Sequence, residues 1–465
     1  MGRKEQKKGG YLTERKFLEI MENDSSHLHF VGVGGVSMYS LARLSLSRGV
    51  RVSGSDRTKS DRTEKLTALG ADIFLKHSAD NLSGSDLVIY SHAVGQDNPE
   101  IQAAVESGIP TISRAEFMGL IMRAYKNRIG ISGSHGKSTV TAMLECIFTY
   151  AGLDPTVLSG SELPSGEPFR LGNDEYLLYE ACEYKDSFLH FSPTVTVGLN
   201  LELDHTDYFP DISSLKKSFT KALGRATNFS LICIDDENLS SILPKIKSRT
   251  ITFGADERAD YRYRITAFRQ RGYEFTLTRQ GSVISDFEVN IPGVFNVANA
   301  TCAIAIALEL GIDAQTLKHA VSTFGGIARR LEFVGTRQGR AVYYDYAHHP
   351  TEIRASITAL KELYPRPLTV VFKPHTFSRT KALWHQLRES LSLADYLILT
   401  DIFPAREEKI EGVSSELLAL EINGAIYAGD DDVLLSLDRH TQGTVVLMGA
   451  GDLEKIKKDV LNKKR

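Results

Sequence analysis

Residues 130–142, GISGSHGKSTVTA, have the composition and spacing of a phosphate-binding loop. A short apolar strand leads into a glycine-rich turn, and an amphipathic helix is predicted from Ser138 onward. Gly133 and Gly136 let the backbone approach a polyphosphate, Lys137 would reach its terminal phosphates, and the Ser138 hydroxyl would bind Mg²⁺. Gly133 lies three positions before Gly136 instead of the more usual five, so an ordinary strand-to-helix turn is the alternative. Because strand and helix are both present, we predict nucleotide binding.

Acidic and imidazole side chains follow two later apolar strands, within YEACEYKDSF (179–188) and NLELDHTDYF (200–209). The carboxyl ends of parallel strands meet at the crevice where α/β proteins bind substrates. Glu180 and His205 could therefore hold a divalent cation beside the phosphates, and this oxygen-plus-imidazole set suits Mg²⁺ or Mn²⁺. The alternative is an exposed strand-end acid and a structural histidine.

Two further groups of polar residues could contact a nucleotide or a substrate. Asn296 and Asn299 lie three residues apart at a predicted helix start, where their amides could face a purine or cap the helix. Arginines, histidines and other polar residues follow the predicted strands of the last third of the chain: Arg329, Arg330, Asp345, Tyr346, His348, His349, His375 and Arg379. Guanidinium groups are rigid forks for phosphate or carboxylate. A zinc site is disfavoured, because an HExxH motif and partner cysteines are absent from the sequence.

Short apolar strands alternate with helical stretches over 28–120 and again after Arg330, which predicts parallel sheets. In the first region the turn at 32–38, GVGGVSM, resembles a dinucleotide fingerprint with Ser37 in place of the third glycine. Asp56 follows the second strand, where an acidic residue usually meets a ribose. Taken alone, this region predicts an NAD-dependent oxidoreductase, but that alternative leaves the phosphate loop and the asparagine pair without a purpose.

In the middle of the chain the sequence pattern changes from alternating strands and helices to consecutive strands. Residues 262–291 alternate their side chains with period two, which predicts an antiparallel meander, and a buried helix is predicted over 297–310. In the last region, apolar spacing predicts a helix over 351–363 with Thr351 as its cap, and another over 380–394.

The chain has 465 residues, 42% of them hydrophobic and 24% charged, which predicts about three domains. We place them at 26–125, 126–327 and 328–465, after a basic tail and lead-in over 1–25. A net charge of −3 argues against general affinity for nucleic acid. No apolar run approaches the roughly 20 residues that span a bilayer, and the basic N-terminus lacks the apolar core of a signal peptide. Four widely spaced cysteines fit reduced thiols in a cytoplasmic protein.

Together these motifs resemble the Mur ligase family over nearly the whole chain. The matching segments, in the family's order, are GVGGVSM, SGSD, QDNPE, SRAEFM, GSHGKST, EACEYKDSFLHFSP, NLELDHTDYF, GVFNVANA, ARRLEF, DYAHHPTE and PHTFSRT. The resemblance implies an α/β fold of three domains: an N-terminal Rossmann-like domain for a UDP-sugar, a central P-loop ATPase-type domain that contains the meander, and a C-terminal Rossmann-like domain. It also implies an ATP- and Mg²⁺-dependent enzyme of peptidoglycan precursor synthesis. This enzyme joins L-alanine to the lactyl carboxylate of UDP-N-acetylmuramic acid through an acyl phosphate.

The resemblance implies roles for individual residues. The ATP-binding set is Gly133, Ser134, His135, Gly136, Lys137, Ser138, Thr139, Asn296, Asn299, Arg330 and Asp345. The metal ligands are Ser138, Glu180 and His205. The UDP-sugar set is Gly34, Gly35, Asp56, His77 and Ser91. The amino-acid end is Tyr346, His348, His375 and Arg379. The residues expected to take part in catalysis are Lys137, Glu180, His205, Arg330, His348 and Arg379. Two residues depart from the family pattern: Ala347 replaces a frequent glycine, and His92 stands where a small hydroxyl residue is usual.

Two related readings remain open beside this one. A murein-recycling ligase of the same family would add a tripeptide instead of alanine. A catalytically silent UDP-sugar sensor is disfavoured because Lys137, Glu180 and His205 are intact. The sequence predicts small-molecule substrates, without nucleic acid or membrane insertion, and does not indicate an oligomeric state.

Overall fold

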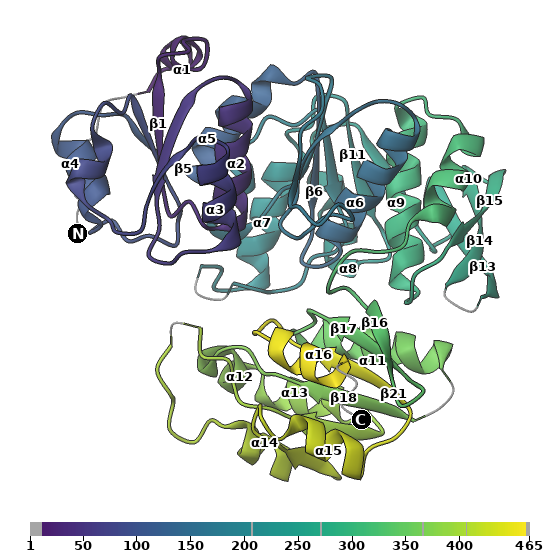
Figure 1. Cartoon of the computed structure of the whole chain (residues 1–465). Coiled ribbons are helices and arrows are strands. Elements are labelled where there is room, and N and C mark those ends of the chain that lie inside the picture. Colours follow the sequence, from purple (N-terminus) through teal and green to yellow (C-terminus); the bar gives the residue numbers. More distant parts are fainter. Residues whose placement is uncertain (1–11, 206–207, 270–271, 365–366, 406, 462–465) are drawn as a thin grey trace. The chain divides into compact units, whose positions relative to one another are not determined.

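A computed structural model describes residues 12–205, 208–269, 272–364, 367–405 and 407–461 (Figure 1). The chain divides into two units, residues 1–252 and 253–465. Most of the predicted basic tail lies outside the described residues, and the lead-in forms α1 (Glu14–Met21), which Thr13 caps. Among the described helices, none is long and apolar enough to cross a membrane.

The first unit begins with a parallel sheet in the order β3-β2-β1-β4-β5. Its strands are β1 (His27–Val31), β2 (Arg51–Ser55), β3 (Asp72–Phe74), β4 (Leu87–Tyr90) and β5 (Thr111–Ser113). The connecting helices are α2 (Val36–Ser47), α3 (Asp61–Ala68), η1 (Ala79–Leu82), α4 (Pro99–Glu106), α5 (Arg114–Ile121) and η2 (Met122–Ala124). Phe30 packs against Phe117 of α5, while its neighbour Val31 clusters with Ala104 of α4. Because successive side chains of a strand point to opposite faces, helices cover both sides of this Rossmann-like sheet.

The second sheet region of the first unit carries the phosphate loop. Strand β6 (Asn127–Ser132) lies between β10 (Val195–Gly198) and β9 (Tyr176–Glu180), parallel to both. Strands β11 (Phe229–Cys233) and β7 (Thr156–Leu158) extend the sheet on the two sides, and β8 (Phe169–Arg170) pairs antiparallel with β7. The helices are α6 (Lys137–Tyr150), η3 (Tyr184–His190), α7 (Ile212–Leu223), α8 (Glu237–Ile242) and η4 (Leu243–Lys245). The predicted strand and helix on either side of the loop are confirmed, and the carboxyl ends of β6, β9 and β10 meet at one edge.

The second unit opens with the predicted meander. Strands β13 (Tyr261–Phe268), β14 (Tyr273–Arg279) and β15 (Ser282–Val289) pair antiparallel, and β12 (Thr250–Gly254) contains the division between the units. Helix α9 (Phe295–Glu309) follows and is buried along most of its length, as predicted, and α10 (Ala314–Thr323) comes next.

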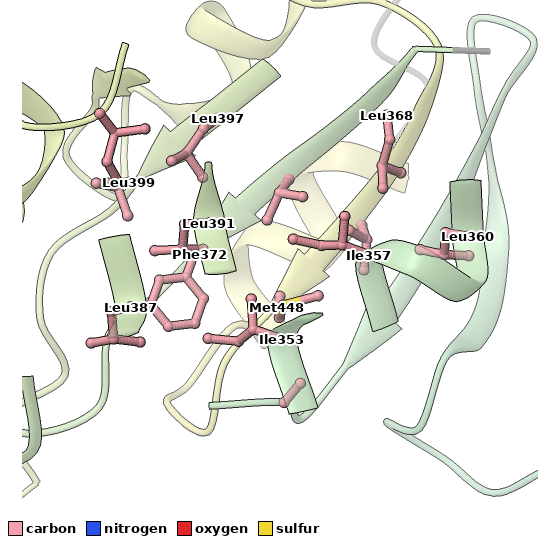
Figure 2. Packing of buried hydrophobic residues seen from close by; sticks show 14 of the residues in the cluster. Ile353, Ile357, Leu360, Leu368, Phe372, Leu387, Leu391, Leu397, Leu399 and Met448 are labelled. Atoms are coloured by element: carbon pink, nitrogen blue, oxygen red, sulfur yellow. The ribbon is translucent and has the colours of Figure 1, made fainter. Parts of the chain in front are cut away.

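The last sheet has the order β16-β17-β21-β18-β19-β20, parallel except for β16 at the edge. Its strands are β16 (Glu332–Arg337), β17 (Arg340–Asp345), β18 (Leu368–Phe372), β19 (Tyr396–Leu399), β20 (Ala425–Tyr427) and β21 (Thr444–Met448). Its helices are α11 (Pro350–Leu363), α12 (Phe377–Ala382), α13 (Trp384–Leu391), α14 (Ser415–Leu420), α15 (Val433–His440) and α16 (Glu454–Leu461). Figure 2 shows Ile353, Ile357 and Leu360 of α11 packed in one buried cluster with Phe372 and Met448. This apolar spacing is the one that predicted the helix.

Two local predictions in this sheet region were wrong. Thr351 is not the cap of α11: the helix begins at Pro350, preceded by His349, because the fixed φ of proline suits the first helical position. The helix predicted over 380–394 is two shorter helices, since Leu383 has a non-helical ψ of 17°. Arg379 therefore lies inside α12 instead of before a helix.

Candidate active site

The phosphate loop is held at the carboxyl ends of β6 and β10. Gly133 has a φ of +150°, and a Cβ there would lie 2.9 Å from Cβ of Leu199, so this position requires glycine. Gly136 has a φ of +84° and immediately precedes α6. The backbone N–H of His135 donates to Oδ1 of Asn200 at 2.8 Å. The loop is thus fixed to the segment that follows β10, with its last glycine opening the helix.

Lys137 folds back over this loop. Its Nζ donates to the carbonyl oxygens of Gly133 and, at 3.3 Å, Ser134, and lies 3.4 Å from Oε2 of Glu183. Burial favours the neutral amine, but the negative charges of Glu183 and Glu180 outweigh it, and the pKa of Lys137 is raised. The loop therefore carries a buried cation.

Three predicted metal ligands come from the same edge of the sheet. Glu180 ends β9, and its Oε1 accepts from Oγ of Ser159 at 2.9 Å and from the backbone N–H of Gly160 at 2.7 Å. Oγ of Ser138 lies 3.2 Å from Oγ of Ser161. With His205, these residues offer a carboxylate, a hydroxyl and an imidazole. This donor set fits Mg²⁺ or Mn²⁺ and lacks the thiolates of a structural zinc site.

Sequence reasoning did not single out Glu183, which contacts both Lys137 and His205. Its side chain is only 5% exposed, and its Oε1 lies 3.7 Å from Nε2 of His205. His205 has a φ of +54° and packs its ring 4.7 Å from that of Tyr184. The second acid of EACE was visible in the sequence. Because β9 ends at Glu180, however, strand alternation could not show where Glu183 points.

Cys182, between these two acids, is a poor nucleophile. Burial and the charge of Glu183 raise the pKa of its thiol. Its thiol therefore stays protonated at neutral pH. Cys146, Cys182, Cys233 and Cys302 are all free thiols.

The first sheet presents the residues expected to bind the UDP-sugar. The backbone N–H of Gly34 donates to Oδ2 of Asp56 at 2.9 Å, and Gly35 directly precedes α2. Nδ1 of His77 lies 2.8 Å from Oε2 of Glu100 and 2.9 Å from Oγ of Ser55.

Glu100, at the start of α4, is a second buried acid that the sequence did not reveal. Burial raises the pKa of this carboxyl. Hydrogen bonds from His29, Ser55, Asn81 and His77 outweigh it and bring the pKa down to about 2. Glu100 is thus an anion that anchors His77.

A cavity of about 530 Å³ connects the two regions of the first unit. Gly35 and Ser37 at the start of α2 line one part of it, together with Ser91 and the unusual His92. Residues of the phosphate-loop region complete the lining, including Lys137, Glu180 and Cys182. The glycine-rich turn and the phosphate loop, about 100 residues apart in the sequence, therefore face the same space.

In the second unit, the asparagine pair forms one buried unit. Nδ2 of Asn299 donates to Oδ1 of Asn296 at 2.9 Å, and Nδ2 of Asn296 donates to the carbonyl of Pro292 at 2.6 Å. The capping alternative was wrong, because Val294 precedes α9 and neither asparagine stands at the cap position.

Asp345 and Arg330 lie near the end of β17. Asp345 is buried and accepts from the hydroxyl of Ser356 and from the backbone N–H of Ala347 at 3.1 Å. Burial raises the pKa of Asp345 to about 6, with Ser356 and Arg330 opposing part of the shift. Nη1 of Arg330 lies 3.4 Å from Oε1 of Glu352.

The residues predicted for the amino-acid end lie close together in the second unit. The ring of His348 lies 5.5 Å from that of Tyr346 and 6.2 Å from that of His375. Burial lowers the pKa of both histidines, and the charge of Arg379 lowers both further, for His375 to about 4. The second unit thus brings Tyr346, His348, His375 and Arg379 together as two neutral imidazoles beside a cation.

His135 and Thr139 are the remaining predicted residues of the phosphate loop. His135 places its Nε2 3.2 Å from Oε2 of Glu202, and Thr139 is buried in the first turn of α6. Arg329 stacks over the rings of Tyr344 and Tyr346 at 5.2 and 4.8 Å, and Arg330 also lies over the ring of Tyr346, at 5.6 Å.

Comparison with known proteins relates this chain to one family throughout. Three family models match: "Mur ligase family, catalytic domain" over 27–126, "Mur ligase middle domain" over 131–307, and "Mur ligase, glutamate ligase domain" over 329–451. A UDP-N-acetylmuramate–L-alanine ligase from Clostridium tetani is 40% identical over 440 residues, covering 92% of this chain and 96% of its own. Its counterpart from Caldicellulosiruptor bescii is 39% identical, with 93% and 98% covered.

Solved structures give the same relationship. The UDP-N-acetylmuramate-alanine ligase of Thermotoga maritima superposes with a TM-score of 0.78 at 26% identity, covering 94% of this chain and 98% of its own. A murein peptide ligase from Psychrobacter arcticus gives 0.69 at 25% identity, with the same coverage. With its phosphate loop, its acids at the ends of the strands and its three matched regions, this chain belongs to the Mur ligase family.

Proposed function

We propose that this protein is an ATP-dependent ligase of peptidoglycan precursor synthesis. It joins L-alanine to the lactyl carboxylate of UDP-N-acetylmuramic acid and releases ADP and phosphate. One observation carries the proposal: a single cavity is lined by the turn that opens α2 and by Lys137 and Glu180. A sugar nucleotide that lay along it could present its carboxylate to the phosphate loop. Relatives at about 40% identity bear the name of this activity.

The first chemical step makes the carboxylate reactive. One carboxylate oxygen attacks the γ-phosphorus of ATP, the bond to the bridging oxygen breaks, and ADP leaves, which produces an acyl phosphate. Lys137 and Arg330 would neutralise the charge that develops on the transferred group. Mg²⁺, held by Ser138, Glu180 and His205, would supply further charge stabilisation when bound. Asn296, Asn299 and Asp345, with the loop from Gly133 to Thr139, would bind the rest of ATP.

The second step forms the amide bond. The alanine amine attacks the acyl carbon, the bond to the phosphate oxygen breaks, and phosphate leaves with the electron pair. Arg379 would hold the alanine carboxylate. His348 and His375 have lowered pKa values and are neutral at pH 7, so either could accept the proton that the amine loses. Tyr346 lines the same cluster.

The remaining assignments concern the sugar nucleotide and the organisation of the chain. Gly34, Gly35, Asp56, His77 and Ser91 would bind the UDP-sugar. We propose domains at 26–125, 126–327 and 328–465, after the lead-in over 1–25. Four free thiols support a reducing compartment, the cytoplasm.

The test is phosphate release from ATP in the presence of UDP-N-acetylmuramic acid. We expect release to require L-alanine and the product to gain the mass of one alanine residue. Release that depended on a tripeptide instead would assign the murein-recycling activity. Reduction of NAD or NADP by the same protein, without phosphate release, would favour an oxidoreductase.

A further inference from the structure

Glu183 is a buried carboxylate that lies between the ammonium group of Lys137 and the imidazole of His205. Its Oε2 lies 3.4 Å from the ammonium of Lys137, and its Oε1 lies 3.7 Å from Nε2 of His205. Because the side chain is 5% exposed, water contributes little to its solvation, and among the described residues its contacts with Lys137 and His205 help to stabilise it. With Oε1 next to the imidazole of His205, Oε2 faces the ammonium group of Lys137.

The same geometry leaves Lys137 with no spare donor. An ammonium group has three N–H donors, and Lys137 directs them to the carbonyls of Gly133 and Ser134 and to Glu183. A polyphosphate that enters the loop must take over at least one of these contacts. The two carbonyls belong to the loop itself and are neutral, whereas Glu183 is an anion. An incoming phosphate is also an anion, so Glu183 is the partner of Lys137 that the phosphate would replace.

We propose that Glu183 is a positioning residue that pairs with Lys137 until the polyphosphate of the nucleotide displaces it. Glu183 holds the lysine folded over the loop, and nucleotide binding therefore includes the breaking of this buried ion pair. The inference deepens the function proposed above and depends on it for the identity of the nucleotide. It makes Glu183 a competitor of the phosphates for one cation, a role distinct from that of Glu180, which the turn at Ser159 and Gly160 holds.

The experiment is a double-mutant cycle on nucleotide binding. Calorimetry measures the Kd of ATP in EDTA, without divalent metal, for the wild type, Glu183→Gln, Lys137→Ala and the double variant. We expect Glu183→Gln to lower the Kd by about 3-fold or more, because a close buried charge pair no longer has to be broken. In the Lys137→Ala background the same change should leave the Kd within a factor of two. Saturated turnover of Glu183→Gln should fall by about 10-fold, since the lysine loses its positioning.

Two controls keep the cycle informative. Glu162→Gln changes an exposed acid of the neighbouring loop and should alter neither the Kd nor turnover. Glu183→Asp keeps the charge and should retain a Kd within a factor of two of wild type. If Glu183→Gln does not fold by circular dichroism, Glu183→Ala replaces it in the cycle with the same expected sign.

An unchanged or higher Kd in the neutral variant would overturn the proposal, as would a tightening that persists without Lys137. Neither result depends on ligation. If the wild type released no phosphate with UDP-N-acetylmuramic acid and L-alanine, the proposed function would fail, while the cycle would still report on Glu183.

Discussion

The carboxylate of Asp56 accepts a 2.9 Å hydrogen bond from the backbone N–H of Gly34, which ties the end of β2 to the turn before α2. A Cβ at Gly34 would lie 2.8 Å from Oδ2 of Asp56, so the approach depends on glycine. Oδ1 of the same carboxylate accepts from the backbone N–H of Arg57 at 2.7 Å. In a dinucleotide-binding domain an acidic residue at this position serves the ribose. Here both oxygens already stabilise the protein's own backbone.

We predict that the first sheet region binds UDP and does not bind NAD or NADP. Ser37 replaces the third glycine of the fingerprint, which alters how closely α2 can approach a pyrophosphate, and the function proposed above gives Asp56 to a uridine nucleotide. Titration of the protein with NAD and NADP up to millimolar concentration should give no saturable signal, whereas UDP should bind. Micromolar NAD binding that UDP competes away would contradict the assignment.

Lys137→Ala should abolish ligation while leaving UDP-sugar affinity within about 3-fold of wild type. The amine lines one wall of the shared cavity, but the residues assigned to UDP lie on the first sheet. Loss of the cation removes charge stabilisation that phosphoryl transfer requires. Calorimetry with UDP-N-acetylmuramic acid and a phosphate-release assay measure the two quantities. Lys126→Ala, an exposed lysine of the same unit, is the control, and a large loss of sugar affinity would count against the prediction.

Much of the fold could be predicted because its strands are apolar runs and its helices have apolar faces. The runs at β1, β4, β6, β17 and β21 are mostly buried, which leaves a strong pattern in the sequence. Several strands were not predicted, among them β3, β16 and β11. Strands β3 and β16 lie at sheet edges, and their residues are largely exposed or half-buried, so polar side chains interrupt the pattern. Strand β11 is buried throughout, and its short apolar run was overlooked.

Site residues that belong to a sequence motif could be predicted. Site residues whose role depends on how the chain packs around them could not. Lys137 and Glu180 follow from the loop and the strand end. Glu183 and Glu100 do not, because an acid in a turn or at the start of a helix is ordinarily solvated. Only the three-dimensional structure shows that Glu183 meets Lys137 and that Glu100 meets His77.

Glu180→Gln should raise the Mg²⁺ concentration needed for half-maximal turnover and lower turnover by about 10²-fold. The amide keeps the shape of the side chain and can still accept from Ser159 and Gly160, so the local fold should persist. What it loses is the negative charge that a divalent cation requires. Turnover measured against Mg²⁺ concentration checks this, with Glu162→Gln as the exposed control. If both quantities stayed at wild-type values, Glu180 would be only a strand-end acid.

Asp345→Asn should change the pH dependence of stability. Burial raises the pKa of Asp345 from 3.8 to about 6 in the folded state. Between these values the unfolded chain releases the proton first, so this residue makes the wild type less stable as pH rises from about 4 to 6. The asparagine variant lacks that loss. Its stability relative to wild type should therefore increase by about 3 kcal/mol from pH 4 to pH 8, measured by denaturant unfolding. A constant difference across this range would show that folding does not raise the pKa of Asp345. Glu416→Gln, at an exposed acid of α14, is the control.

Arg379→Lys should weaken the binding of L-alanine more than the binding of ATP or UDP-N-acetylmuramic acid. Arg379 lies in α12, where its backbone N–H donates to Oγ1 of Thr376 at 3.4 Å, and its charge is felt by both His348 and His375. Lysine keeps the positive charge but loses the planar, two-point grip on a carboxylate. We expect the KM of L-alanine to rise by about 10-fold or more, with smaller changes for ATP and UDP-N-acetylmuramic acid.

The KM values of L-alanine, ATP and UDP-N-acetylmuramic acid, measured together, identify which substrate Arg379 binds. Arg388→Lys, a half-exposed arginine of α13 paired with Glu421, makes the same chemical change away from the imidazole cluster and should leave all three constants unchanged. Because only the alanine carboxylate should need the fork of Arg379, a rise confined to the KM of alanine supports this role. If all three constants shifted together, Arg379 would also hold the lactyl group or its phosphate. An unchanged alanine KM would mean that the amino-acid carboxylate binds elsewhere.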